Sequence, residues 1–455
     1  MTIDDVNRMY AIVSVGNRMV VMQLAPDGSI VELWDYEHFR KRLIKEFIRV
    51  RKPDGKIKSE PLADVWLRHP RGRQYDRLVY SMPGSIVQAT ERDYNGWQGF
   101  SCVPKVGDWS LNRQHLYEII CGSNDENFYW TMNWLAALVQ LPGRHAWTAI
   151  VLMGGQGIGK GHFANNMIGR LFGPQQYLHI IGAGQLTAEF NEHLSGKVLI
   201  YADESTWGGD PRAAAKLKGI ITEDMVPINR KFLKMIDEPS SMHTIIASNN
   251  EWPIPIEQGD RRFSIFNVAH TYQQDQAYFG RLLAELENGG RAAMLAELLA
   301  FNVDHSLLRK PVMTAAKATV AERSAKPIEK WWIEVLRRGT LVDDTWPDRI
   351  QKRDLHANYL SFIDKHQRNN RDPHATETEL GFFLNKYTPI TQQRVREAGK
   401  IERILWVPDL ATCRSTWVTT MGWPTNYVWG DEDDDKPQPD AVDVWAPPKR
   451  DPDEM

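Results

Sequence analysis

Apolar residues in the first 120 positions of the chain fall into short runs. Each run has the length and composition of a β-strand, and turn signals such as Pro-Asp-Gly and Asn-Gly accompany them. The runs cover residues 11–15, 18–24 and 77–82. This pattern predicts an N-terminal α+β module over residues 1–120.

After residue 120 the pattern changes to alternating helical and strand-like segments. Ser123 or Asn124 can cap a helix over residues 125–140, which a Pro-Gly pair terminates. An apolar run over residues 146–153 then predicts a buried strand. Strands that alternate with helices predict a parallel α/β sheet. The expected later elements are a helix from about 160, a strand at 178–181, a helix at 185–194, and strands at 198–201 and 244–247.

The last part of the chain is expected to be mainly helical. Residues 273–325 have a helical pattern, and residues 328–425 resemble a small separate domain. That domain has helices, one of them near residues 354–367, and late strands near 402–407 and 415–420, which is compatible with a winged helix. The acidic, Pro-rich end predicts disorder. The expected domains are residues 1–120, 121–325 and 328–425, followed by a tail at 426–455.

The composition narrows the class of protein. Of the 455 residues, 42% are hydrophobic and 25% are charged, as in ordinary globular proteins. The sequence has no apolar run of the roughly 18 residues that a membrane span needs, and its start is unlike a secretory signal. The three cysteines have neither a disulfide nor a zinc-ligand spacing. We therefore expect a cytoplasmic protein without a membrane partner.

Charge is unevenly distributed along the chain. The formal net charge is -3, whereas residues 431–455 contain ten acidic and three basic residues, so the rest of the chain is at +4. A mildly basic body with an acidic tail is compatible with nucleic-acid binding but does not require it.

The segment AWTAIVLM-GGQGIGKG-HFANNMIGRLF is the most informative part of the sequence. A buried strand leads into a glycine-rich loop that opens a helix, which is the arrangement of a phosphate-binding loop. Backbone N–H groups of such a loop surround phosphate oxygens, and its lysine reaches the β- and γ-phosphates. The residues expected to bind the nucleotide are Gly154, Gly155, Gln156, Gly157, Ile158, Gly159, Lys160, Gly161 and His162.

An acidic pair follows the next-but-one predicted strand, in GKVLIYADES. A phosphate-loop ATPase holds Mg²⁺ through an acidic residue at a strand end. Asp203 is therefore the expected Mg²⁺ residue, and Glu204 is the expected base that activates water. The position of the pair, about 40 residues after the loop and directly after an apolar strand, distinguishes it from an ordinary solvated charge pair.

Two further groups could complete the site. The strand HTIIASNN ends in Asn249 and Asn250, either of which could contact the γ-phosphate or merely form a turn. Arg261 and Arg262 precede another strand-like run. One of them could reach a neighbouring copy's ATP as an arginine finger, or both could bind local carboxylates.

Taken together, GGQGIGKG, LIYADE, LKGIITEDMVPINRKFLK and IIASNN followed by GDRR resemble the superfamily 3 helicases, a branch of the AAA+ ATPases. The similarity is to the helicase module of phage and prophage primase-helicases, over residues 64–335. It implies a P-loop AAA+ core in a hexameric ring that moves on single-stranded or forked DNA in phage or mobile-element replication, in the host cytoplasm. The implied cofactors are ATP and Mg²⁺.

The resemblance assigns roles to the named residues. Lys160, Asp203, Glu204 and Asn249 would be catalytic, with Asn249 as the sensor, and Arg261 or Arg262 would be the finger. The basic segment would be a pore hairpin in which Asn229, Arg230, Lys231 or Lys234 contacts the strand.

Two departures from the family pattern stand out. Gly161 replaces the Ser or Thr hydroxyl that binds Mg²⁺, so water is expected to supply that ligand. The 63 residues before the resemblance are too few for a primase domain, so a separate primase or polymerase is expected. The alternatives are an initiator or loader that uses ATP as a switch, and a small-molecule kinase.

A second basic segment lies near the N-terminus. Between Arg40 and Lys58 there are nine Lys or Arg residues and two acidic ones. Such a cluster can bind phosphate without reading sequence, or it can be a solvated face. The sequence alone favours the solvated face.

Overall fold

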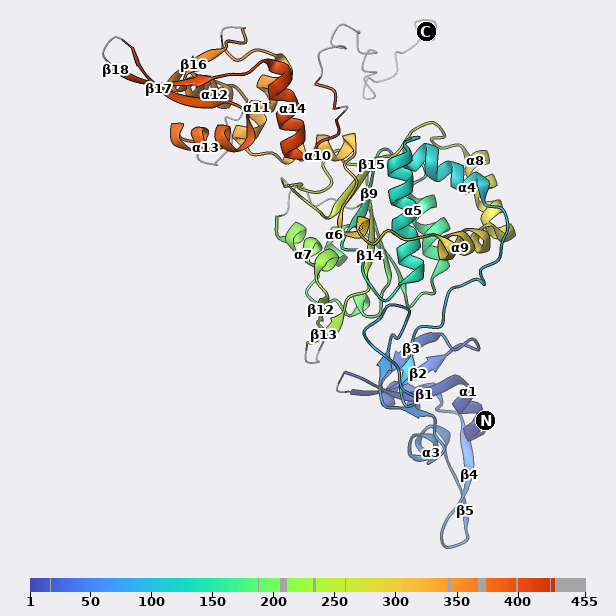
Figure 1. Ribbon diagram of the computed structural model, residues 1–455. Coiled ribbons are helices and arrows are strands. Elements are labelled where there is room, and N and C mark those ends of the chain that lie inside the picture. The colour runs from blue at the N-terminus through green and yellow to red at the C-terminus, as the bar shows by residue number, and fades with distance from the viewer. Residues whose placement is uncertain are drawn as a thin grey trace, which may run out of the picture. The chain divides into compact units, whose positions relative to one another are not determined.

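The computed structural model describes residues 1–16, 18–186, 188–204, 211–231, 235–257, 259–342, 345–366, 374–397, 400–425 and 427–429. The chain forms two compact units, Met1–Ser324 and Ala325–Met455 (Figure 1). The four-domain division expected from the sequence stays a prediction. Lys234 and the tail from residue 430 lie outside the described residues.

The N-terminal part of the first unit is built on a four-stranded sheet with the order β3-β2-β1-β6. β1, β2 and β3 are successive antiparallel strands, and β6 pairs with β1 in parallel. Their inward side chains pack on three helices around the fully buried Trp66. The bounds are β1 Tyr10–Val15, β2 Arg18–Leu24, β3 Ile30–Trp34, β6 Gln74–Tyr75, α1 Ile3–Met9, α2 Tyr36–Arg42 and α3 Leu62–Arg68.

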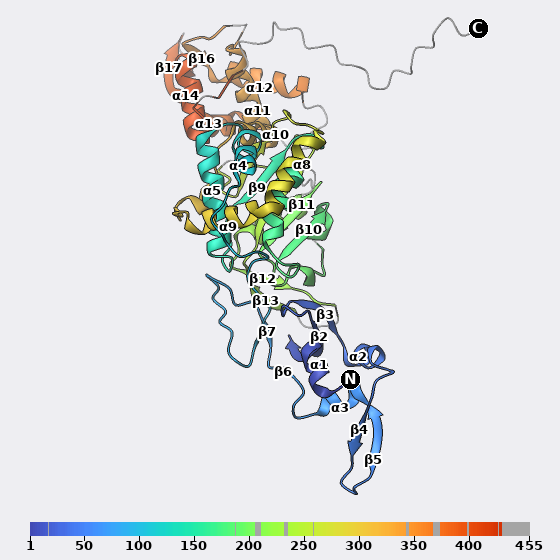
Figure 2. The same cartoon turned by 90° about the vertical axis from the view of Figure 1, so that its right-hand side faces the viewer.

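Two smaller strand pairs accompany this sheet. β4 (Phe47–Arg51) and β5 (Ile57–Pro61) form an antiparallel hairpin, which extends beyond α3 in both views of the molecule (Figures 1 and 2). β7 (Leu78–Val79) and β8 (Tyr94–Asn95) form a short parallel pair. The expected strand at 77–82 is therefore mostly an extended loop.

That loop carries a tyrosine that joins the N-terminal part to the rest of the first unit. A Cβ atom added to Gly96 would lie 2.5 Å from Cε1 of Tyr80, and one added to Gly196 would overlap the same ring. Gly196 also has a left-handed φ of 69°. Burial raises the pKa of Tyr80 to about 12. The ring is thus enclosed by two glycines that lie 100 positions apart.

The central part of the first unit is a five-stranded sheet in which every strand pair is parallel. This confirms the predicted parallel α/β sheet. The strand order is β10-β11-β14-β9-β15, so β14 lies between the phosphate-loop strand β9 and the acidic strand β11. The bounds are β9 Ala149–Met153, β10 Tyr177–Ile181, β11 Leu199–Asp203, β14 His243–Ser248 and β15 Phe263–Asn267.

Alternate side chains of these strands enter two separate apolar clusters, one on each face of the sheet. Ile150 and Leu152 pack with α5 and α9, whereas Val151 packs with α7 and α10 (Figure 1). Burial on both faces explains why these strands are continuously apolar in sequence. The helices and remaining elements are α4 Ser110–His115, η1 Leu116–Ile120, α5 Asp125–Gln140, η2 His162–Ile168, η3 Gly169–Leu171, α6 Ala183–Leu186, η4 Glu192–Leu194, α7 Pro211–Thr222, β12 Met225–Ile228, β13 Ile236–Pro239, α8 Gln276–Glu285, η5 Leu286–Gly290, α9 Arg291–Ala300, η6 Leu307–Arg309 and α10 Ala315–Ser324.

The helix predicted over residues 125–140 is confirmed. Asn124 caps it by accepting a hydrogen bond from the Asn127 N–H at 2.9 Å. The helix predicted over 185–194 is wrong, because only the short elements α6 and η4 form there. Asn191 interrupts this segment: its side chain binds the backbone of Pro227 and Asn229 across the next hairpin.

The second unit combines helices with a three-stranded antiparallel sheet in the order β16-β18-β17. Its core contains the buried residues Trp331, Trp332 and Trp417. The strand predicted at 415–420 is wrong, because α14 covers it: Asp409 caps the helix start and Gly422 ends it in a left-handed conformation. The bounds are α11 Pro327–Arg338, β16 Arg349–Gln351, α12 Lys352–His366, α13 Glu377–Tyr387, β17 Thr391–Glu397, β18 Lys400–Trp406 and α14 Leu410–Met421.

Candidate phosphate-binding site

The glycine-rich loop begins where β9 ends and requires glycine at three positions. Gly154, Gly157 and Gly159 have φ values of 133°, 73° and 107°, which side chains with a Cβ rarely adopt. A Cβ at Gly159 would also lie 2.7 Å from Cε1 of His115. A side chain at any of these three positions would therefore strain the loop.

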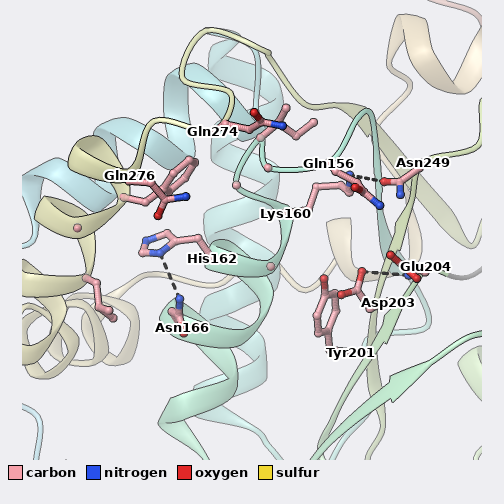
Figure 3. Close-up of a pocket in the computed structure, with 17 residues that line it drawn as sticks. Gln156, Lys160, His162, Asn166, Tyr201, Asp203, Glu204, Asn249, Gln274 and Gln276 are labelled. Carbon is pink, nitrogen blue, oxygen red and sulfur yellow. Dashed lines mark hydrogen bonds between the residues drawn. The ribbon is translucent and has the colours of Figure 1, made fainter. Parts of the chain in front are cut away.

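Lys160 is folded into this loop. Its ammonium group donates to the carbonyl oxygens of Gly154 and Gly155 at 2.5 and 2.6 Å. It also donates to Oδ1 of Asn249 at 2.9 Å (Figure 3). The side chain is only 7% exposed. Burial lowers the pKa of Lys160, and the nearby Asp203 and Glu204 partly oppose that effect. Within the described part of the chain, three neutral oxygens thus contact this cation and no carboxylate pairs with it.

A cavity of about 540 Å³ opens over Lys160. This volume is in the range of small-molecule sites. The phosphate loop, the ends of β11 and β14, and the start of α8 line it (Figure 3). The lining residues are Gln156, Gly157, Ile158, Gly159, Lys160, Gly161, His162, Asn166, Tyr201, Asp203, Glu204, Asn249, Gln274, Gln276, Phe279, Gly280 and Leu283.

The acidic pair lies at the carboxyl end of β11, as its sequence position predicts. The Glu204 N–H donates to Oδ1 of Asp203 at 3.0 Å, and Glu204 has a left-handed φ of 48°. His179 Nε2 lies 3.7 Å from Asp203 Oδ2. Because β14 separates β11 from β9, the two strands are roughly 10 Å apart. That gap leaves room for a phosphate chain between Lys160 and Asp203.

The two asparagines at the end of β14 have different roles in the structure. Asn249 contacts Lys160, whereas Oδ1 of Asn250 accepts a hydrogen bond from the Trp252 N–H at 2.8 Å. Such a bond is typical of an Asx turn. Of the two alternatives that the sequence left open, only Asn249 lines the cavity.

A tyrosine lies where the Ser or Thr of a usual phosphate loop would be. A Cβ added to Gly161 would meet one neighbour within 4 Å, the hydroxyl oxygen of Tyr201 at 3.7 Å. Tyr201 is 1% exposed, and burial together with the neighbouring carboxylate of Asp203 raises the pKa of its hydroxyl group. This buried hydroxyl beside a carboxylate is the kind of donor set that fits a hydrated Mg²⁺.

Two buried histidines lie next to the phosphate loop: His115 lies beside Gly159, and His162 lies at the start of the helix that follows the loop. His162 Nε2 lies 2.7 Å from Asn112 Oδ1, and His115 Nδ1 lies 3.1 Å from the Tyr278 hydroxyl. Burial lowers the pKa of His162 to about 4 and that of His115 to about 3, so both rings are neutral near pH 7. The sequence placed His162 at the site but missed His115, because 45 positions separate it from the loop lysine.

Arg261 and Arg262 lie at the opposite end of the strands from the phosphate loop. They precede β15, whose first residue pairs with the start of β9, so roughly 16 Å of strand separates them from the phosphate loop of the same chain. Arg262 Nη1 lies 3.3 Å from the buried carboxylate of Asp260, whereas Arg261 is exposed. A role of either arginine at a neighbouring copy's nucleotide stays a prediction.

The predicted DNA-contacting hairpin is formed by β12 and β13. Arg230 is 5% exposed, and its guanidinium binds Glu238 at 2.7 Å and Ser195 at 3.2 Å. Contact with a DNA strand would require Arg230 to leave these partners. Asn229 binds the backbone of Glu189, and Lys231 is exposed. Their DNA-binding role stays a prediction.

The described residues contain no group of three or more His, Cys, Asp or Glu side chains that could hold a metal ion by itself. None of the described helices has the length and apolar character needed to cross a bilayer.

Part of this chain is similar in sequence to a family of unknown function and to a phage primase-polymerase. Residues 152–262 match the model of a family of unknown function, DUF5906. The chain is 28% identical to the DNA primase-polymerase of Nitratiruptor phage NrS-1 over 206 residues, which are 44% of this chain and 28% of that relative. The match thus covers little more than a quarter of the relative's length.

Solved structures of the NrS-1 C-terminal region have a similar fold. One apo structure has a TM-score of 0.59 at 18% identity and covers 88% of this chain and 96% of that one. A second, in the A form, has a TM-score of 0.61 at 17% identity and covers the same shares. At this level of identity the likeness shows the fold alone.

These matches correct the sequence-based assignment. The resemblance to a superfamily 3 helicase, the function of an ATP-dependent DNA helicase and the class of ATP hydrolase are wrong, because the matched relative is a primase-polymerase. The error has a physical reason. A phosphate loop and an acidic strand end on a parallel sheet specify where a triphosphate fits, but not what is done with it.

Proposed function

We propose that this chain is the nucleotide-binding part of a DNA replication protein of the primase-polymerase type. Its phosphate loop would bind the triphosphate of ATP together with Mg²⁺. The observation that carries this proposal is the Lys160 ammonium, which is buried against three neutral oxygens at the floor of an open cavity. A buried cation without a paired carboxylate is stabilised by an anionic ligand.

The loop sequence and conformation support an anionic ligand such as a phosphate. In phosphate loops of this kind, backbone N–H groups surround phosphate oxygens, and the positive end of the helix that begins at Lys160 adds to the attraction. Phe279 and Leu283 add apolar surface at the side of the cavity. Such surface suits the base and sugar of a nucleotide.

The residues for Mg²⁺ are Asp203 and Tyr201. Bound Mg²⁺ would neutralise charge on the terminal phosphates and would keep several of its waters. Asp203 would hold the ion through one of these waters. The Tyr201 hydroxyl, beside Gly161, would accept a hydrogen bond from another and so replace the missing Ser or Thr.

The finer architecture belongs to the same proposal. We assign the central sheet to the P-loop AAA+ type and the second unit to a winged helix. The three-stranded antiparallel sheet with its β17–β18 hairpin and the helices α11, α12 and α13 support the second assignment. A ring of six copies and a separate primase or polymerase partner remain predictions, which light scattering and co-purification would test.

The proposal is tested by titrating the purified chain with fluorescent ATP in the presence and absence of Mg²⁺. We expect saturable binding that Mg²⁺ strengthens and unlabelled ATP reverses. A folded chain that binds no nucleoside triphosphate would overturn the site. The replication role is tested separately by incorporation of labelled nucleotides on a DNA template. A chain that binds ATP but neither binds DNA nor changes that synthesis would overturn the role and leave the site intact.

A further inference from the structure

The β4–β5 hairpin has one face that packs on the protein and one that is open to solvent. Ile48 and Val50 are half-buried and pack against the cluster around Trp66. Phe47, Arg49 and Arg51 alternate with them and are exposed. Because successive residues of a strand point to opposite faces, these three side chains lie on the outer face.

The partner strand completes that outer face without adding an acidic group. Phe47 pairs with Pro61, Arg49 with Ser59 and Arg51 with Ile57. Phe47 and Ile57 are 56% and 67% exposed, which is unusual for large apolar side chains. The outer face therefore places two arginines between two exposed apolar residues.

The basic residues of this region divide into paired and unpaired groups. Arg40 and Lys41 of α2 form ion pairs with Asp64 and Glu37 at 2.7 and 2.8 Å. Lys52 also pairs, with Glu60. Arg49 and Arg51 form no ion pair with any residue that the structure describes. Their charge is thus available to a ligand, whereas two of the three basic residues of the neighbouring helix α2 form ion pairs.

We propose that the outer face of the β4–β5 hairpin binds single-stranded DNA, with Arg49 and Arg51 on phosphates and Phe47 against a base. Basic groups beside an exposed aromatic ring are the combination that tracks a single strand without reading its sequence. The choice of DNA as the ligand rests on the proposed replication function. The exposed basic and aromatic surface is observed independently of that function. This site is separate from the β12–β13 hairpin, where Arg230 is buried and paired.

The test compares two double variants that remove the same charge from neighbouring positions. In the first, Arg49→Gln and Arg51→Gln neutralise the hairpin. In the second, Arg40→Gln and Lys41→Gln neutralise α2. Affinity for a fluorescein-labelled oligothymidylate is measured by anisotropy at several salt concentrations, and ATP binding is measured on the same samples.

We expect the hairpin variant to lose about tenfold in affinity and the slope of log K against log salt to fall by roughly 1.4, for two phosphate contacts. The α2 variant should change affinity less than about twofold. Phe47→Ala should weaken binding at least fivefold with little change of slope, because stacking is not a charge effect. ATP binding should be unchanged in all three.

Several results would overturn the proposal. Equal losses in the two double variants would mean that only overall charge matters. Wild-type affinity of the hairpin variant would mean that DNA binds elsewhere. Equal competition by polyglutamate would point to an acidic protein as the partner, and preference for duplex would exclude a single-strand site. The Lys160→Met variant should lose ATP binding and retain DNA binding. A failure of the DNA-binding proposal can therefore be distinguished from a failure of the proposed nucleotide site.

Discussion

Lys160 in the phosphate loop and Arg49 on the β4–β5 hairpin carry the same charge in opposite surroundings. Lys160 is held by three fixed oxygens inside a cavity, and burial lowers its pKa. Arg49 is exposed on the outer face of a two-stranded ribbon. A buried cation is screened little by salt and selects by geometry, whereas an exposed one is screened and selects by charge alone. The surroundings of Lys160 therefore suit a compact polyphosphate, whereas those of Arg49 suit a long polyanion.

Removal of the Lys160 charge is the strongest test of this comparison. Lys160→Met keeps an unbranched side chain and should weaken ATP binding on the order of 100-fold or more, because two charge-assisted hydrogen bonds to phosphate are lost. Isothermal titration would measure the change. DNA binding should hardly respond.

Lys197 provides a matched control for that variant. Its ammonium also binds two backbone carbonyls, at 3.0 and 2.9 Å, and burial lowers its pKa to about 8, but it does not line the cavity. Lys197→Met should leave ATP affinity as it is in the wild type. Equal losses in the two variants would mean that the effect comes from general destabilisation.

Acid should lower the stability of the fold through the buried histidines of the phosphate-loop region, whereas the exposed arginines of the hairpin stay charged. The pKa of His162 is lowered to about 4 in the folded state, from 6.5, so the unfolded chain takes up the proton first as the pH falls. Stability is therefore complete above pH 6.5 and is lost as the pH falls toward 4. Between pH 7 and pH 5, this ring alone should lower the free energy of unfolding by about 2 kcal/mol.

Urea unfolding of the wild type and of His162→Gln at pH 7 and pH 5 would measure that loss. The variant keeps a donor for Asn112 but cannot titrate, so its stability should fall less over this interval. If the two proteins respond equally to pH, other groups such as His115 carry the acid sensitivity.

Salt should weaken DNA binding by the hairpin more than it weakens ATP binding in the cavity. Between about 50 and about 200 mM salt, affinity for single-stranded DNA should fall at least five- to tenfold for two phosphate contacts. ATP affinity at saturating Mg²⁺ should change less than about twofold over the same range, because the cavity is screened less. Parallel titrations of one preparation would decide this, and equal salt slopes for the two ligands would remove the distinction.

The smallest effect is expected at the Mg²⁺ position. Tyr201→Phe removes one hydroxyl and should lower the Mg²⁺-dependent part of ATP affinity about fivefold, as for one neutral hydrogen bond. Gly161→Ser has room for its Cβ beside that hydroxyl and should restore part of the loss in the double variant. The affinity would be followed as a function of Mg²⁺ concentration.

Tyr177→Phe is the control for this pair. The Tyr177 hydroxyl binds Asn165 at 3.2 Å and does not line the cavity, so its removal should leave the Mg²⁺ dependence unchanged. A Tyr201→Phe variant with the same Mg²⁺ dependence as the wild type would show that the tyrosine serves only packing.

Local signals in the sequence predicted the central sheet well and the relations between distant segments poorly. The apolar runs that became β9, β11 and β14 are buried on both faces, so their composition alone identifies them. Lys160 and Asp203 could be placed because each follows such a strand. His115 and Tyr80 could not, because their contacts with the loop and with Gly196 depend on chain segments that meet only in the fold.

The sequence placed one feature of the second unit wrongly, for an understandable reason. Thr and Val at 415–420 favour a strand, but Asp409 and Gly422 set helix ends on either side and Trp417 packs inside. The sequence also could not show that Arg40, Lys41 and Lys52 of the basic stretch form ion pairs, whereas Arg49 and Arg51 form none with the described residues. Neither distinction is visible without the neighbours in space.

The enclosed ring of Tyr80 has a practical consequence for anyone who wishes to express the phosphate-loop part alone. The sequence suggests a domain boundary near residue 121. A truncated chain that starts there would lack Tyr80, so the surface at Gly196 that the tyrosine ring covers would be exposed to water. Gly196 lies three residues before the start of β11, the strand that ends in Asp203, so the exposed site would be close in sequence to the acidic pair. A fragment meant to keep this packing therefore has to retain both Tyr80 and Gly96.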